Sequence, residues 1–247
     1  MGTWYRMHSD FPSSRAPWWL FVCCWLCSVI PSGAQSNRLL FFKEVPLPQP
    51  GDPTVLRLNK AFGYSVRNQG GKLVTGLGSP GRTTELATPA GRFEGIDHGE
   101  FGGVLRFHGP DKHAAPVVIK EGNVRLIFQS HGQVYFVEGL AHLGYSAGAL
   151  YRVTGTAPAL GYAQVFAFND APEAFALVND TLYIAQSHGF TVLRALQPDV
   201  IVQRTFWGGL HPNSVAVFGD TAYVGLRGGY ARVIVSTRHV SFFKHVL

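Results

Sequence analysis

Short apolar runs separated by polar turn residues recur along the second half of the chain. Two such stretches match at an offset of 40 residues, each with a two-residue turn followed by a run rich in β-branched and aromatic residues. The turns are Asn179-Asp180 and Gly219-Asp220, pairs that suit the positive φ values of a tight hairpin. Runs of this length bounded by turn residues are typical of strands. The pattern predicts strands over 174–178, 181–186, 190–195 and 199–204, and again over 214–218, 221–226, 230–235 and 239–244.

A repeated unit of four short strands exposes an apolar face that it cannot bury alone, so neighbouring units must stack. Radial stacking of four-stranded units gives a β-propeller. A second internal similarity, at 44 residues, indicates two earlier units with a longer loop between their second and third strands. The sequence therefore predicts an all-β fold, a β-propeller of about five four-stranded blades, with six as the alternative. The supporting segments are 94–98 with 138–142, 103–107 with 148–152, strands over 124–128 and 133–137, and an atypical first blade with strands over 55–58, 64–67 and 72–75.

The beginning of the chain has the features of a secretory signal peptide. Residues 1–34 combine two arginines with an uncharged apolar run over 18–30 and small residues at 32–34, which predicts cleavage after Ala34. The run is shorter than a membrane span requires. A Pro-rich segment over 35–53 follows, in which 39–42 is expected to form an edge strand that completes the last blade. Residues 54–247 are the predicted propeller domain, in a protein that is periplasmic or secreted.

Composition narrows the class of protein further. The chain is 46% hydrophobic and 15% charged and has 29 glycines, as expected of a sheet protein with many tight turns. The net charge of +6 falls to +5 without residues 1–34, and the basic residues are scattered, which argues against nucleic-acid binding. All three cysteines, Cys23, Cys24 and Cys27, lie in the predicted signal peptide, so the mature protein is expected to have no disulfide and no thiolate site.

One segment carries a family resemblance. Residues 212–224 resemble the repeat of NHL-like and SMP-30/gluconolactonase-like propellers, in which proline and small residues precede an apolar strand, a Gly/Asp turn and a second strand. With its segments 97–103 and 207–214, the chain is similar to a group of exported bacterial propeller-like proteins, a likeness that implies no activity. The SMP-30-like resemblance implies a divalent metal on the propeller axis and the opening of lactones or related esters. The residue types for such a site are present at Glu94, Asp97, Glu138 and Asn213.

Two Glu/His pairs are the main candidates for a functional site. Glu94 with His98, and Glu138 with His142, occupy equivalent places in successive units, near the end of a second strand. Equivalent positions of propeller blades converge on one face, where carboxylates and imidazoles bind metals or act as acid and base. The alternative is that each pair only braces a loop.

Polar residues of the later units extend this candidate set. His188, Gln186 and Arg227 fall near corresponding places and would complete a polar ring, unless they are solvated hairpin tips. An Arg that faces a cleft favours an anionic or carboxylate ligand through its fork of donors. Trp207, in the connection between two blades, is expected to pack in the core.

These observations lead to three hypotheses. The first is a non-catalytic binding module, expected to be monomeric, that holds a small molecule, glycan or protein segment at one mouth of the ring. The second is a metal-dependent lactone or ester hydrolase, with Glu94, Glu138 and Asn213 as oxygen ligands and His98 or His142 as proton carrier. The third is a structural envelope protein. No Gly-x-Ser-x-Gly elbow supports serine hydrolysis, and no partner membrane is expected after signal cleavage.

Overall fold

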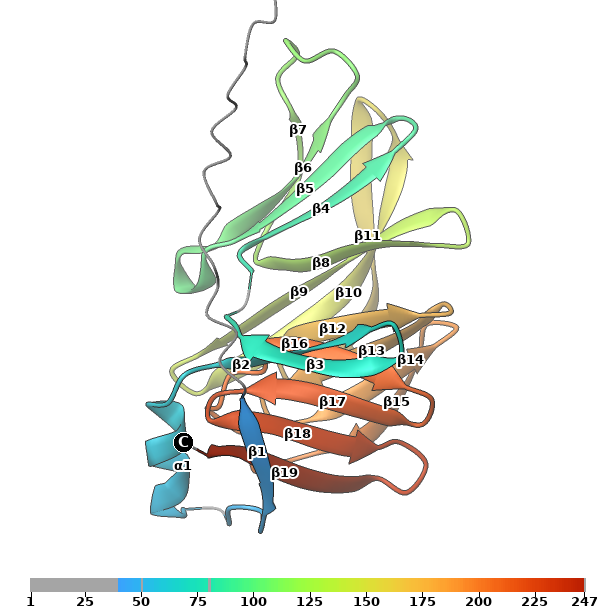
Figure 1. Ribbon diagram of the computed structural model, residues 1–247. Coiled ribbons are helices and arrows are strands. Elements are labelled where there is room, and N and C mark those ends of the chain that lie inside the picture. Colours follow the sequence, from blue (N-terminus) through green and yellow to red (C-terminus); the bar gives the residue numbers. More distant parts are fainter. Residues whose placement is uncertain (1–39, 50, 80, 247) are drawn as a thin grey trace, which may run out of the picture. The chain divides into compact units, whose positions relative to one another are not determined.

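The computed structural model describes residues 40–49, 51–79 and 81–246, and antiparallel sheets dominate it (Figure 1). The predicted signal peptide, with its three cysteines and its expected cleavage point, lies outside these residues. Four sheets are formed by consecutive strands in meander order, as the repeats predict. Their strands are β4 (Thr83–Thr88), β5 (Gly91–Asp97), β6 (Gly103–His108) and β7 (Val117–Glu121); β8 (Val124–Ser130), β9 (Gln133–His142), β10 (Tyr145–Thr156) and β11 (Ala159–Phe168); β12 (Pro172–Val178), β13 (Thr181–Gln186), β14 (Phe190–Arg194) and β15 (Gln197–Val202); and β16 (Ser214–Phe218), β17 (Thr221–Leu226), β18 (Gly229–Ile234) and β19 (His239–Val246).

The two late sheets follow the 40-residue repeat closely. β13, β16 and β17 have the bounds that the sequence pattern predicts, and the other late strands differ by a few residues at their ends. At the first hairpin, Asn179 and Asp180 adopt φ values of 47° and 57°, the left-handed geometry that a two-residue turn requires. In the second hairpin Gly219 takes this role with a φ of 56°.

The first strand of the described residues confirms the expected edge strand. β1 (Phe41–Val45) pairs antiparallel with β19, and Val45 lies opposite Phe242. Its bounds are shifted from the expected 39–42. The sheet already has four strands of its own, so β1 adds a fifth strand instead of completing a missing one. The chain thus begins and ends in the same sheet over the residues that the structure describes.

The expected first blade is smaller than predicted. Only two strands form there, β2 (Tyr64–Gln69) and β3 (Lys72–Leu77). The predicted strand over 55–58 is wrong: those residues belong to helix α1 (Pro53–Asn59). The side chain of Asp52 caps this helix by accepting a hydrogen bond from the Thr54 amide at 2.7 Å, and Pro53 provides a φ suited to the first turn. The capping signal overrides the strand-like composition.

The early sheets also depart from the expected loops. In the β9–β10 hairpin the residues expected to form a longer loop extend both strands instead, and a tight turn at Leu143-Gly144 joins the strands. Between β5 and β6 they form a short 3-10 helix, η1 (Gly99–Phe101). The prediction of a longer loop in both units is therefore wrong for the second of them. Three strands, β4, β7 and β11, lacked a clear sequence signal.

The sheets pack on one another through their first strands. β4 contacts β8, β8 contacts β12, β12 contacts β16, and β16 contacts the β2–β3 hairpin. Apolar clusters fill these contacts; Trp207, as expected, is a fully buried member of the largest. No comparable packing joins β2–β3 to β4–β7 within the described residues. The fold is all-β and propeller-like, with four four-stranded meanders and one hairpin in place of five or six full blades.

None of the helices in the described part of the chain is long and apolar enough to cross a membrane.

Candidate ligand-binding site

Three charged side chains from three different sheets form a buried network. Asp97 ends β5, Arg125 lies near the start of β8, and Glu173 lies near the start of β12. Nη1 of Arg125 is 3.0 Å from Oδ2 of Asp97, and its Nη2 is 3.6 Å from Oε2 of Glu173. The exposed fractions of the three side chains are only 7%, 12% and 8% in chain order. The network therefore marks one end of the stacked sheets, where first and second strands converge.

Local irregularities in the strands direct two of these side chains. The β8–β9 register shifts between Val124 and Leu126, which makes Arg125 the extra residue of a β-bulge. The β12–β13 register shifts in the same way around Glu173. A bulge turns a side chain away from the regular alternation of the strand, and bulges are common beside functional sites. Equivalent bulges in neighbouring sheets thus bring Arg125 and Glu173 together.

The surroundings of Glu173 explain its electrostatics. Burial raises the pKa of the Glu173 carboxyl, while the Arg125 charge and a hydrogen bond from the Ser187 hydroxyl, at 2.8 Å, counteract this effect. Nearby Asp170 raises the pKa further. The carboxylate of Asp170 in turn accepts bonds from the Ser146 hydroxyl at 2.6 Å and from the His188 amide at 2.6 Å.

Beyond this network lies a pocket of about 530 Å³ between the end of α1, the β2–β3 hairpin and β16–β17. Its basic residues are Lys60, His211 and Arg227, and none of its lining residues is acidic. Burial lowers the pKa of His211, and the charges of Arg227 and Arg125 lower it further. A pocket with such walls carries an excess of positive charge. The lining residues are Asn59, Lys60, Ala61, Phe62, Gly63, Gly78, Ser79, His211, Asn213 and Arg227.

Neutral groups hold the polar side chains of this pocket in place. Nη1 of Arg227 donates to the Asn59 carbonyl at 2.8 Å and also to the Asn59 side-chain oxygen, so its charge is oriented without being neutralised. Asn213 accepts a hydrogen bond from the Ser214 hydroxyl at 2.8 Å. The Ser214 hydroxyl also accepts the Val66 amide at 2.8 Å, which ties the hairpin to β16. The pocket is therefore largely pre-formed.

Comparisons with known proteins add little to this picture. No family model matches the chain, and no curated protein matches it. A chain of the crystal structure of the nidogen/laminin complex is similar with a TM-score of 0.31 and 9% identity, over 75% of this chain and 93% of that chain. The computationally designed Ika8 protein is similar with a TM-score of 0.34 and 9% identity, over 73% of each chain. Likenesses of this strength carry no argument about function.

The structure separates the two glutamates of the sequence-based candidate set. Glu94 follows Phe93, which faces the β8–β11 sheet, so the Glu94 side chain lies on the opposite face of its own sheet. There its Oε2 is 3.0 Å from Nε2 of His108. Glu138 lies on the same face of β9 as Phe136, between the two sheets, where Oε2 is 2.8 Å from the Lys120 ammonium. The β4–β7 sheet thus stands between the two carboxylates.

The histidines of those pairs are not partners of the glutamates. His98 is exposed, and its backbone amide donates to the Gly102 carbonyl at 2.7 Å. His142 is exposed at the end of β9, with Nε2 2.8 Å from the Glu100 carboxylate. In the described part of the chain, no three His, Cys, Asp or Glu side chains gather in a way that could hold a metal ion. Glu94, Glu138 and Asn213 are therefore not arranged as a common ligand set.

The residues of the later units have mixed placements. Arg227 and Asn213 line the same pocket. The side chain of Gln186 forms hydrogen bonds within the fold. It accepts from the Thr191 hydroxyl at 2.6 Å and donates to the Asp170 carbonyl at 3.1 Å. The ring of His188 is exposed, with Nδ1 3.0 Å from Oδ1 of Asp170.

Sequence reasoning missed Arg125, Glu173, His211 and Lys60. For Arg125 a signal was available, since it is the one charged residue in the apolar run 124–128. The other three had no distinguishing pattern. Glu173 depends on a bulge, Lys60 on the unexpected helix, and His211 on the connection between β15 and β16.

Proposed function

We propose that this protein is an exported, propeller-like binding module that holds a small carboxylate-bearing molecule in the pocket of Lys60, His211 and Arg227. In this proposal the β2–β3 hairpin is a reduced fifth blade, and residues 1–34 direct the chain to the periplasm or the medium. The mature protein is a monomer with no fixed need for a metal.

The observation that carries the proposal is the charge of the pocket. Three basic residues and, among the described residues, no acidic one line a space of about 530 Å³, within the usual size range of small-molecule sites. A guanidinium presents a planar fork of donors that matches a carboxylate. Because the groups that accept from Arg227 within the described residues are neutral groups of Asn59, its positive charge is left for a ligand.

The hydrolase alternative has less support. It requires Glu94 and Glu138 to share one metal ion with Asn213, whereas each glutamate already faces a basic residue of its own, His108 and Lys120 respectively. We therefore do not retain it as a second candidate function.

Titration calorimetry with citrate at pH 7.5, using glucose as an uncharged control, tests the proposal. Citrate should bind and glucose should not. Lys60→Gln alters an exposed residue at the rim and should weaken citrate binding about tenfold, the value of one charge-assisted hydrogen bond.

Two further variants make the test specific to the pocket. Lys72→Gln removes an equal charge from the exposed start of β3 and should leave binding unchanged. Arg227→Lys keeps the charge but loses the fork, and should also weaken binding. Absence of citrate binding, or equal effects of Lys60→Gln and Lys72→Gln, would favour a structural role for the protein.

A further inference from the structure

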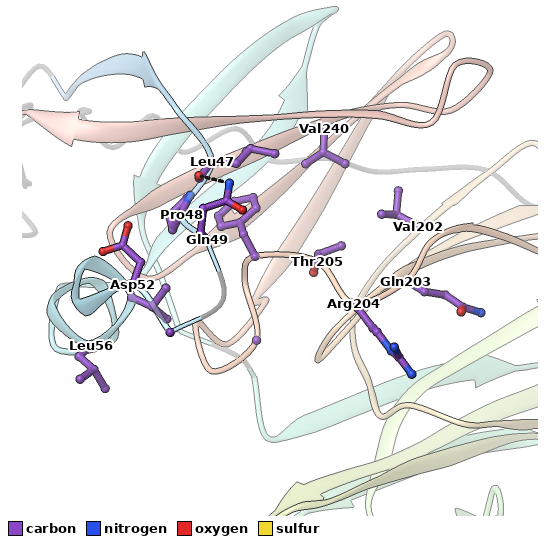
Figure 2. Close-up of a pocket in the computed structure, with 14 residues that line it drawn as sticks. Leu47, Pro48, Gln49, Asp52, Leu56, Val202, Gln203, Arg204, Thr205 and Val240 are labelled. Carbon is purple, nitrogen blue, oxygen red and sulfur yellow. Dashed lines mark hydrogen bonds between the residues drawn. The ribbon is translucent and has the colours of Figure 1, made fainter.

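A second cavity, of about 590 Å³, lies on another part of the surface and shares no lining residue with the pocket of Arg227. One wall comes from the segment after β1 and from α1, with Leu47, Gln49 and Leu56. The other comes from the segment that follows β15, with Gln203 and Arg204. Figure 2 shows these two walls facing each other across the cavity.

The floor of this cavity is apolar. Val55, Val202, Phe206 and Val240 line it while also packing against the largest core cluster. The Phe206 ring is held by an aromatic contact with Phe242, at 4.9 Å between centroids. Such a floor is rigid, because it is the outer layer of the core and not a mobile loop.

The rim is apolar on the side of the helix. Leu56 is 68% exposed and Leu47 is 37% exposed, values that leave large side chains in water beside an open cavity. A ligand with a hydrocarbon chain would bury both side chains together with the floor, and each buried methylene is worth about 0.8 kcal/mol.

Two polar groups of the β15–β16 connection remain unused. The Thr205 hydroxyl oxygen is buried and has no hydrogen-bond partner among the described residues. The neighbouring Arg204 is exposed, and no acidic side chain in the described part of the chain pairs with it.

The acidic residue of the cavity stands on the opposite wall. Asp52 accepts the Thr54 amide as the cap of α1, so its carboxylate has a structural role. A negative ligand group is therefore favoured beside Arg204 and disfavoured beside Asp52. The cavity is therefore asymmetric. Arg204 makes one side positively charged, and the side of α1 is apolar except for Asp52.

We propose that this cavity binds a medium-chain monocarboxylate, with its carboxylate at Arg204 and its hydrocarbon chain on Val55, Phe206 and Val240. The inference is independent of the carboxylate pocket at Arg227, because the two sites share no residue.

Decanoate, kept below its micelle concentration, is the probe, and titration calorimetry on the full chain measures its affinity. Affinity should rise about fourfold per methylene from hexanoate to decanoate, which is 0.8 kcal/mol expressed as a ratio of dissociation constants. Decanol should bind at least fivefold more weakly than decanoate. An Arg227→Lys variant should bind decanoate normally, which separates this site from the first.

Variants at exposed positions test the assignment without disturbing the fold. Arg204→Gln should remove the preference for decanoate over decanol, while Arg67→Gln, an exposed residue of β2, should not. Leu56→Glu adds a negative charge at the apolar rim and should weaken decanoate binding at least fivefold. Equal binding of decanoate and decanol, no dependence on chain length, or insensitivity to both Arg204→Gln and Leu56→Glu would overturn the proposal.

Discussion

The guanidinium of Arg125 lies 3.0 Å from the Asp97 carboxylate, and this buried ion pair joins the β8–β11 sheet to the β4–β7 sheet. The same guanidinium reaches Glu173 of a third sheet. Three units of a repeating architecture are thus connected by one side chain, close to a pocket whose His211 responds to the same positive charge. We expect that loss of this connection lowers the free energy of unfolding.

Replacing Arg125 with methionine should destabilise the protein by about 3–5 kcal/mol, because two buried carboxylates lose the guanidinium that pairs with both of them. Urea unfolding measures the change. The control is Arg194→Met, which removes an exposed ion pair with Asp199, at 3.1 Å, and should cost no more than about 1 kcal/mol. Equal effects of the two substitutions would show that the network is not a structural connection.

Gly103, at the start of β6, should also be sensitive to substitution, though less so than Arg125. A Cβ on Gly103 would collide with the Ile96 carbonyl oxygen and lie 2.6 Å from the Gly122 carbonyl oxygen, both rigid backbone groups. Gly103→Ala should therefore lower the free energy of unfolding by about 1–3 kcal/mol. At Gly109 the same change meets no atom within 4 Å and should be nearly neutral. Thermal unfolding of both variants checks the packing at the start of β6.

Loss of the Lys120–Glu138 ion pair should destabilise the protein to an extent that depends on pH. Burial raises the pKa of Glu138 above 4.5, while Lys120 counteracts the shift. In Lys120→Met this pKa should rise further, so the folded state retains a proton that the unfolded state releases between pH 4.5 and the raised pKa. The variant should lose about 3 kcal/mol at pH 7 and less at pH 4. Unfolding at both pH values measures this, and the double variant with Glu138→Gln should recover stability at pH 7.

Anion binding should strengthen as the pH falls. The pKa of His211 lies below its ordinary value of 6.5, because burial and two arginines disfavour its charged form. A bound anion raises that pKa, so binding takes up a proton and affinity increases on acidification. Sulfate is a suitable probe because it keeps its charge in this range. Its affinity should rise about tenfold from pH 8 to pH 5.5, and His211→Gln should remove the dependence. A flat profile for the wild-type protein would contradict the placement of the anion beside His211.

Much of the fold follows from the sequence, because period and turn chemistry are local properties. The turn at Asn179-Asp180 and the strands that flank it follow from residue type alone. The helix over Pro53–Asn59 does not, since its residues Val55 and Leu56 also suit a strand and the cap at Asp52 decides the outcome.

The site is less accessible to sequence reasoning than the fold. Glu94 and Glu138 occupy equivalent repeat positions, yet they lie on opposite faces of the β4–β7 sheet. Repeats specify strands, whereas the direction of a side chain depends on register and bulges. Arg125 and Glu173 illustrate this, because each is the extra residue of a bulge that a single sequence does not reveal.

A crystal structure of the protein grown with citrate at neutral pH would show where the anion binds. We expect citrate in the pocket, with a carboxylate on the Arg227 guanidinium and others within reach of Lys60 and His211. Citrate bound elsewhere, with the Arg227 pocket containing only water, would contradict the claim that this is the ligand site of the protein.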